Sequence, residues 1–235
     1  MAAELKKAIY PENATIGLPT QHRFDPYTLN GGTIVGVAGD NFAILAGDTR
    51  LSEGFMIHSR DTSKIYKLTE KTFLGTCGFQ GDVLTLTRLL NARLTMYEFE
   101  HRKKMSSTAI SQMLSTVLYY RRFFPYYTFN ILAGIDTDGK GCIYSYDAVG
   151  NYEKHTYHAS GTASSMLQPL LDNQVGYLNQ EGVRRVPLTI DKARTLIKDV
   201  FISATERDMY TGDSLHIVTI TSDGVTEDHF PLRRD

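Results

Sequence analysis

The stretch from residue 30 to residue 50 constrains the fold more than any other part of this chain. It reads NGGTIVGV and then, after turn residues at Gly39–Asn41, FAILAGDTR. The first run is rich in β-branched residues and has no helical spacing, so the two runs predict a buried hairpin. Asp48 and Arg50 then fall at a strand end, where rigid backbone can hold a carboxylate and a guanidinium. We expect either chemistry or the remains of it at this point.

Length and charge narrow the class of protein. At 235 residues, the chain is long enough for one large domain or two small ones, and it can bury a full core. Its 42% hydrophobic and 22% charged residues are ordinary for a globular protein. A net charge of −1 argues against a nucleic-acid partner and against a basic patch for a membrane surface.

The two cysteines, Cys77 and Cys142, lie in apolar, strand-like runs and lack the spacing of metal ligands. We therefore expect two reduced, packed thiols in a protein of the cytoplasm or nucleus. No stretch approaches the roughly 20 apolar residues of a membrane span. Residues 1–20 also lack the apolar segment of a secretory signal, so we expect no membrane partner.

Residues 1–29 are mixed in composition, contain Pro11, Pro19 and Pro26, and follow no period. We interpret them as a flexible leader in front of the fold, because proline interrupts both helices and strands. For residues 23–29 an alternative stays open, in which this part is an arm packed against a neighbour.

The rest of the chain predicts grouped strands and helices rather than a regular alternation of the two. Helical spacing follows Asp82, Ser106 and a cap at Thr189 or Asp191, and a helix over 161–173 is expected to kink or break at Pro169. Grouped helices favour an α+β protein with antiparallel sheets covered by helices in one layered domain. Beyond the opening hairpin, we expect strands at 64–68, 72–78, 128–135, 142–146, 152–158, 215–221 and 226–232.

Familiar catalytic and metal-binding motifs are missing from the sequence. There is no Gly-x-Ser-x-Gly, His-Glu-x-x-His, phosphate-binding Gly-x-x-x-x-Gly-Lys-Ser/Thr or Cys-x-x-Cys pattern. His155 and His158 differ by three positions, so an ideal strand would point them to opposite faces. We therefore expect no metal and no cofactor.

A set of polar and glycine residues falls at the ends of the expected elements, and such ends gather at one edge of a layered sheet fold. Each member alone has an ordinary explanation: Asp48 and Arg50 as a local ion pair, for example, or Lys64 as a solvated strand end. The order of the whole set along the chain is more informative. The set comprises Thr33, Asp48, Arg50, Lys64, Gly78, Ser160, Asp208 and Thr211.

Five short motifs carry a resemblance to a known family: 31–34 (GGTI), 47–50 (GDTR), 75–78 (GTCG), 159–161 (ASG) and 207–212 (RDMYTG). With them, the chain resembles the β-type subunits of the proteasome core particle from about residue 23 to its C-terminus. Residues 121–127, 170–175 and 203–207 further resemble the eukaryotic subunit at the sixth β position. The resemblance thus implies a leader or propeptide at 1–22 and a single domain at 23–235.

This resemblance implies the fold of the N-terminal-nucleophile hydrolases, a four-layer αββα sandwich with two antiparallel sheets between helix layers. It also implies a four-ring particle that degrades proteins in an ATP- and ubiquitin-dependent way in the cytoplasm and nucleus. The implied partners are adjacent β subunits in a seven-membered ring, β subunits of the opposite ring and α-ring subunits.

In active members of the family, a threonine directly follows a glycine, and autolysis between them frees the threonine as nucleophile. The resemblance puts Gly32 at that position, since Asp48 and Lys64 lie 16 and 32 residues further on, as the family's acid and lysine do. The other implied positions are Gly78 as oxyanion glycine, Ser160 and Asp208 as supporting residues, Thr211 in place of the last serine, and Arg50 near the acid.

A glycine has no hydroxyl, so the expected function is a non-catalytic structural subunit whose leader is cut by a neighbour near His22. The alternative is an active threonine peptidase that uses Thr33, or an enzyme with another nucleophile such as Ser160. Strand alternation argues against Thr33, because a shift of one residue moves the position by about 3.3 Å and turns the side chain to the opposite face.

Overall fold

The structure is a computed structural model that describes residues 24–235. The leader at 1–22 and the cleavage position near His22 lie outside the described residues. The predicted opening hairpin forms as β1 (Thr33–Ala38) and β2 (Phe42–Asp48), in which every residue is buried. It lies in a five-stranded antiparallel sheet of order β10-β1-β2-β11-β12, with β10 (Tyr157–Gly161), β11 (Ser214–Thr221) and β12 (Val225–Pro231).

A second five-stranded antiparallel sheet packs against the first. Its order follows the chain, β5-β6-β7-β8-β9, and adjacent strands pair as neighbours in sequence. These strands are β5 (Ile65–Thr69), β6 (Thr72–Gly78), β7 (Thr128–Ile135), β8 (Gly141–Tyr146) and β9 (Tyr152–His155).

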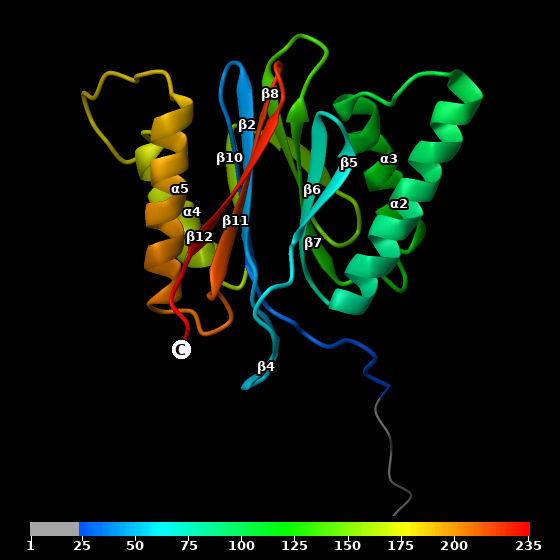
Figure 1. The fold of residues 1–235 in the computed structure, drawn as a ribbon, viewed down its shortest axis with the longest axis horizontal. Helices are drawn as coiled ribbons and strands as arrows, with labels where there is room; N and C mark the ends of the chain where they lie inside the picture. The colour runs from blue at the N-terminus through cyan, green and yellow to red at the C-terminus, as the bar shows by residue number, and fades with distance from the viewer. Residues whose placement is uncertain (1–23) are drawn as a thin grey trace, which may run out of the picture.

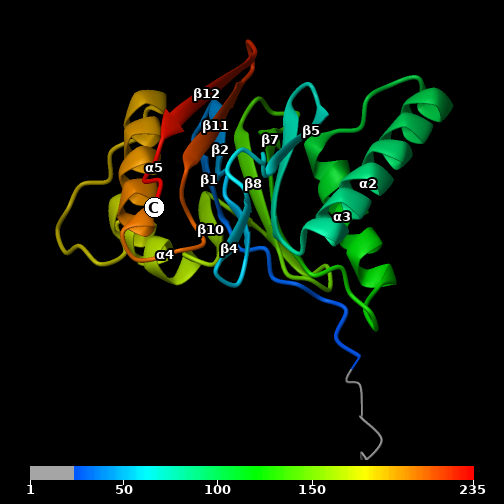
Figure 2. The same cartoon turned by 60° about the horizontal axis from the view of Figure 1, so that its bottom comes forward.

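Two pairs of helices cover the outer faces of the sheets. Helices α4 (Ser164–Gln174) and α5 (Ile190–Thr205) lie on the first sheet, and α2 (Gln80–His101) and α3 (Ser107–Tyr120) lie on the second. Figures 1 and 2 show the resulting order of helices, sheet, sheet and helices. The predicted four-layer αββα sandwich is thereby confirmed. No helix within residues 24–235 is long and apolar enough to cross a membrane.

Side chains of β1 alternate between two of the three apolar cores of the described residues. Val35 and Val37 face α4 and α5, whereas Ile34 faces the second sheet and packs with Leu45 and Ile131. A third core fills the space between the second sheet and helices α2 and α3. Because side chains of a strand alternate between its faces, consecutive residues of β1 lie in different layers.

The secondary structure differs from the expected one at three places. The single strand predicted at 152–158 is two strands, β9 and β10, which belong to different sheets. The break lies at Thr156, and it lets the rings of His155 and His158 stack with centroids 5.2 Å apart rather than face opposite sides. Of the kink or break expected at Pro169, the break does not occur, because α4 is one continuous helix. A small hairpin, β3 (Leu51–Glu53) with β4 (Met56–Ser59), was not predicted.

Residues 24–29 have no regular structure, but they lie against the end of the second sheet rather than apart from the fold. The Tyr27 hydroxyl donates a 2.6 Å hydrogen bond to the Pro125 carbonyl, and its ring packs on Phe124 and Tyr127. The expectation of a flexible leader as far as residue 29 was therefore wrong for this part. The segment contacts its own chain.

Candidate functional site

Gly32 lies directly before β1 and faces the side chain of Lys64. Its backbone has φ +89°, a left-handed conformation that suits glycine. A Cβ added at this residue would overlap Lys64 Cε and lie 2.7 Å from Lys64 Nζ. The space in which a side chain at position 32 would begin is therefore filled by Lys64.

Lys64 is buried, and each of its three N–H donors has an acceptor. Its Nζ donates to the main-chain oxygens of Asp48 (2.9 Å) and Arg50 (2.6 Å), and it lies 3.1 Å from Asp48 Oδ1. An ammonium group has three donors and no acceptor. The contacts of Lys64 thus link the end of β2 to the start of β5.

The Asp48 carboxylate is fully buried and joins four parts of the chain. Besides Lys64, it accepts hydrogen bonds from the backbone N–H groups of Thr33 (2.8 Å), Arg50 (3.2 Å) and Gly212 (3.4 Å). Burial raises the pKa of Asp48, and the Lys64 ammonium with the backbone N–H groups opposes that rise. Removal of one partner would leave the other buried without compensation.

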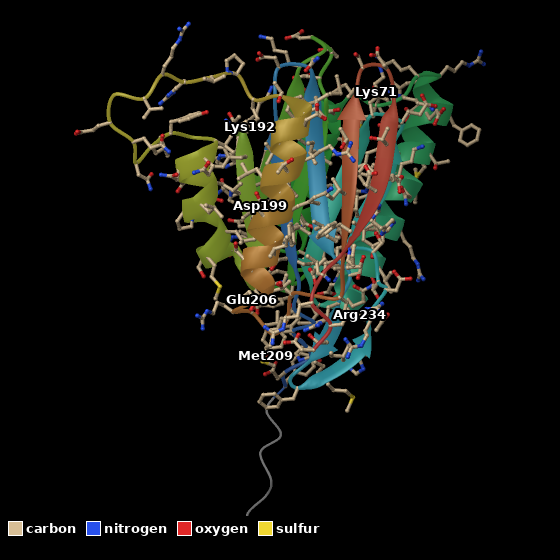
Figure 3. The ribbon with its side chains drawn as sticks, turned by 60° about the vertical axis from the view of Figure 1, so that its left-hand side comes forward. Lys71, Lys192, Asp199, Glu206, Met209 and Arg234 are labelled. Atoms are coloured by element: carbon tan, nitrogen blue, oxygen red, sulfur yellow. The ribbon has the colours of Figure 1, made fainter. Side chains whose placement is uncertain are left out.

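Arg50 does not form a side-chain ion pair with Asp48, so that ordinary explanation was wrong. Its Nε donates to Asp213 Oδ2 at 2.8 Å, and its Nη1 donates to the Met209 carbonyl at 2.8 Å. Figure 3 shows Met209 at the end of the molecule where the chain leaves α5 for β11. Asp213 was missed, because 163 residues separate it from Arg50 and no local pattern marks the pair.

The pKa of Asp213 reflects the same contacts. Burial acts to raise the pKa of this carboxyl, but hydrogen bonds and charges from Arg50 and Arg60 outweigh burial and lower it. Arg60 Nη1 lies 2.5 Å from Asp213 Oδ1. Asp213 is therefore an anion that ties the β2 end to the loop before β11.

Gly78 lies at the end of β6, beside Gly32. It has φ +117°, and an added Cβ would lie 2.5 Å from the Tyr127 carbonyl oxygen, so only glycine fits. Gly32, Gly78 and Cys77 line one cavity of about 190 Å³. Burial raises the pKa of the Cys77 thiol to about 12, so this thiol stays neutral near pH 7 and is no nucleophile.

Asp208 and Thr211 come together with Thr33 on the other side of the backbone. Thr211 Oγ1 donates to Asp208 Oδ2 at 2.7 Å and lies 2.8 Å from Thr33 Oγ1. Because Thr211 donates its single proton to Asp208, Thr33 is the donor in the bond to Thr211, and Thr33 Oγ1 also accepts from the Ala163 N–H at 3.0 Å. This hydroxyl cluster lies at the N-terminal end of α4.

Thr162 is a hydroxyl residue of this cluster that the sequence analysis did not single out, and the supporting role implied for Ser160 stays a prediction. Thr162 Oγ1 donates to Asp208 Oδ2 at 2.6 Å, and the Thr162 N–H donates to the Gly32 carbonyl at 3.1 Å. Ser160 is opposite Ile34 in the β10–β1 register, on the face toward the second sheet. The signal available in the sequence was a hydroxyl residue just before the α4 start.

The structure therefore brings Gly32, Asp48, Lys64 and Gly78 together on one side of the strand start, and Asp208 and Thr211 on the other. The Thr33 hydroxyl belongs to the second group: its contacts are with Ala163, Thr162 and Thr211. Within residues 24–235, no group of three or more His, Cys, Asp or Glu side chains is arranged to hold a metal ion.

Two stacked antiparallel sheets between helix layers, with a buried lysine–carboxylate pair at the start of the first strand, define a sandwich of the N-terminal-nucleophile hydrolase type. Comparisons with known proteins place the chain within this class. Residues 28–220 match the family model described as "Proteasome subunit".

Relatives match over most of their length and carry the name "Proteasome subunit beta type-1". The zebrafish (Danio rerio) protein is 58% identical over 217 residues, which is 92% of each chain. The Drosophila melanogaster protein is 52% identical over 214 residues, covering 90% of this chain and 91% of the relative. The Arabidopsis thaliana protein is 46% identical over 220 residues, covering 92% and 99%. The chain belongs to the proteasome subunit family, and these relatives confirm the resemblance to its β-type subunits.

Proposed function

We propose that this chain is a non-catalytic β subunit of the proteasome core particle, which builds the wall of the proteolytic chamber while neighbouring subunits cleave. One observation carries the proposal: the residue that faces Lys64 and Asp48 at the start of the first strand is Gly32. Enzymes of this class need a hydroxyl at that residue as the nucleophile and its freed amine as the base. Gly32 has no hydroxyl, so this route of acyl transfer is closed.

An active peptidase that uses Thr33 is the alternative, and the hydrogen bonds around Thr33 argue against it. The Thr33 hydroxyl points toward Thr211 and the α4 start, whereas Lys64 lies on the side that Gly32 faces. A misplacement of about 1 Å can cost on the order of a hundredfold in rate, and here the displacement is about a whole strand residue.

The proposed partners are adjacent β subunits in a seven-membered ring, β subunits of the opposite ring and α-ring subunits. Exposed aromatic side chains support a need for partners: Phe55 is 98% exposed, Phe123 93% and Tyr120 86%. Large exposed apolar side chains that cluster on a surface mark contact sites. In this setting the chain serves ATP- and ubiquitin-dependent protein degradation in the cytoplasm and nucleus.

The leader is proposed to be cut near His22 by a neighbouring active subunit. Self-cleavage needs a nucleophile at residue 32, and glycine does not supply one. The described part of the chain starts beyond that position, so the proposal rests on the chemistry of Gly32.

A mechanism-based probe for N-terminal threonine, applied to the purified particle, tests the proposed function. Mass spectrometry should find the probe on active neighbours and none on this chain. Label on Thr33 or Ser160 would contradict the proposal. Gel filtration of a native extract checks the partners, because the chain should elute only in a very large particle.

A further inference from the structure

Asn30 uses both its main chain and its side chain to hold the segment that leads to Gly32. Its N–H donates to the Gly78 carbonyl (3.1 Å) and its carbonyl accepts from the Ser52 N–H (3.2 Å). Its side-chain amide donates to the Ser52 carbonyl (3.2 Å) and accepts from the Gln80 N–H (2.9 Å). Although no regular element contains Asn30, only 7% of it is exposed.

These partners are backbone groups of three different elements. Ser52 lies in β3, Gly78 ends β6, and Gln80 begins α2. Gly78 and Gly32 line the same cavity of about 190 Å³. Free N–H and C=O groups at strand edges are the groups with which an incoming extended peptide pairs. In this chain, Asn30 is already hydrogen-bonded to such groups of Ser52, Gly78 and Gln80.

Tyr27 anchors the same segment three residues upstream. Its hydroxyl donates to the Pro125 carbonyl at 2.6 Å, and its ring contacts Phe79, Phe124 and Tyr127 with centroids 5.4–6.4 Å apart. Aromatic pairs at such separations stabilise beyond the burial of area alone. The segment 24–31, here called the arm, is therefore held at Tyr27 and at Asn30. In Figures 1 and 2 it runs along the end of the second sheet.

We infer that the arm is a built-in occupant of the approach to Gly32, so that this subunit neither cleaves nor admits an extended peptide at that position. The inference rests on the proposed function, because an arm fixed in this place is compatible with a subunit that does not cut. It goes beyond that function, since loss of the hydroxyl alone would leave the backbone groups of Ser52, Gly78 and Gln80 free to bind peptide.

The test uses the assembled particle with its active subunits blocked, and a biotinylated, photoreactive tripeptide without an electrophile as the probe. Wild type should show no crosslink at residues 51–53 or 77–82 of this chain. The double variant Tyr27→Ala/Asn30→Ala should gain crosslinking there by about tenfold or more, since several hydrogen bonds hold the arm. Asn151→Ala, a change at an exposed asparagine of another loop, should stay at the wild-type level.

The inference would be overturned if the double variant assembled and its crosslinking equalled that of wild type. Should the double variant fail to assemble, hydrogen exchange on the wild-type particle decides. The amides of Asn30, Ser52 and Gln80 should exchange slowly, and fast exchange would overturn the inference. A threonine-directed label on this chain would instead defeat the proposed function, so the two failures are distinguishable.

Discussion

Gly32 and Thr33 are neighbours in the sequence, yet their two environments differ in kind. On the Gly32 side, the Lys64 ammonium and the Asp48 carboxylate are buried together and paired. On the Thr33 side, three threonine hydroxyls and Asp208 form a chain of hydrogen bonds beside α4. The first environment has the groups of a catalytic site without a nucleophile. The second has a nucleophile-like hydroxyl without the lysine.

The comparison teaches that inactivity here is a matter of which face a side chain occupies. The chain has hydroxyl groups and charged groups within a few residues of each other, and the β-strand keeps them apart because adjacent side chains point to opposite faces. The charged pair persists because each member compensates the other inside the fold.

The largest expected effect comes from breaking the charged side. Lys64→Met should destabilise the chain by about 3–5 kcal/mol, because it leaves the Asp48 carboxylate buried without its cation. Thermal unfolding of the purified chain, or the yield of assembled particle, measures the loss. Lys67→Met, at an exposed position of β5, is the matched control and should change little. If the Lys64→Met chain were as stable as this control, the stabilising role of the Lys64–Asp48 pair would be contradicted.

A threonine placed on the charged side should not restore activity. Gly32→Thr puts a Cβ at φ +89° and against Lys64 Cε, so the chain should lose stability and the site should remain inert to the threonine probe. Gly54→Thr separates the two causes, because Gly54 also has positive φ but nothing within 4 Å.

Gly54→Thr should cost about 1–2 kcal/mol for the left-handed backbone alone. Gly32→Thr should cost about 1–3 kcal/mol more, from the overlap with Lys64. Equal costs would show that Lys64 moves aside freely. Probe labelling of the threonine at position 32 would show that the missing hydroxyl is the whole difference between this chain and an active subunit.

A smaller effect is expected on the hydroxyl side. Thr33→Val keeps the shape of the side chain but leaves the Ala163 N–H without its acceptor and removes the hydrogen bond between Thr33 and Thr211, whereas Thr211 keeps its bond to Asp208. We expect a loss of about 1–3 kcal/mol in unfolding free energy and no change in the peptidase activity of the particle. Thr116→Val on the exposed face of α3 is the control. A fall in particle activity with normal assembly would point to a catalytic role for Thr33.

The smallest effect concerns the loss of stability at acidic pH, at a histidine that belongs to neither the Gly32 side nor the Thr33 side. Burial lowers the pKa of His216, the nearby His229 lowers it further, and a hydrogen bond with Glu227 opposes them. A histidine with a lowered folded pKa is favoured in its neutral form, so its contribution to stability is lost as pH falls below about 6.5.

Melting temperatures at pH 7.5 and 5.5 test this expectation. Wild type should lose more stability on acidification than His216→Gln, whereas the exposed-site variant His58→Gln should behave as wild type. An equal loss in wild type and His216→Gln would assign the acid sensitivity to other groups.

Sequence periodicity predicted the parts of the fold whose signal is local. The β1–β2 hairpin and the α5 stripe, with its Thr189 cap, appear as expected because burial and capping leave a pattern within a few residues. The β3–β4 hairpin was missed because its exposed, short strands carry no apolar alternation. The break at Thr156 was missed because a strand that changes sheets leaves the alternation almost intact.

The site divided in the same way. The resemblance to the family placed Gly32, Asp48 and Lys64, and their separations of 16 and 32 residues supported that placement. The Arg50–Asp213 pair and the hydrogen bond from Thr162 to Asp208 depend on how distant loops meet. A single sequence does not encode that meeting in any local pattern, so these contacts required coordinates.

The most direct test of the central claim is the N-terminus of this chain isolated from the mature particle, determined by sequencing or intact mass. Because Gly32 supplies no nucleophile for self-cleavage, the account predicts an N-terminus near residue 23, upstream of the arm. An N-terminus at Thr33 would contradict it, since a free amine on Thr33 is what a threonine peptidase of this class requires.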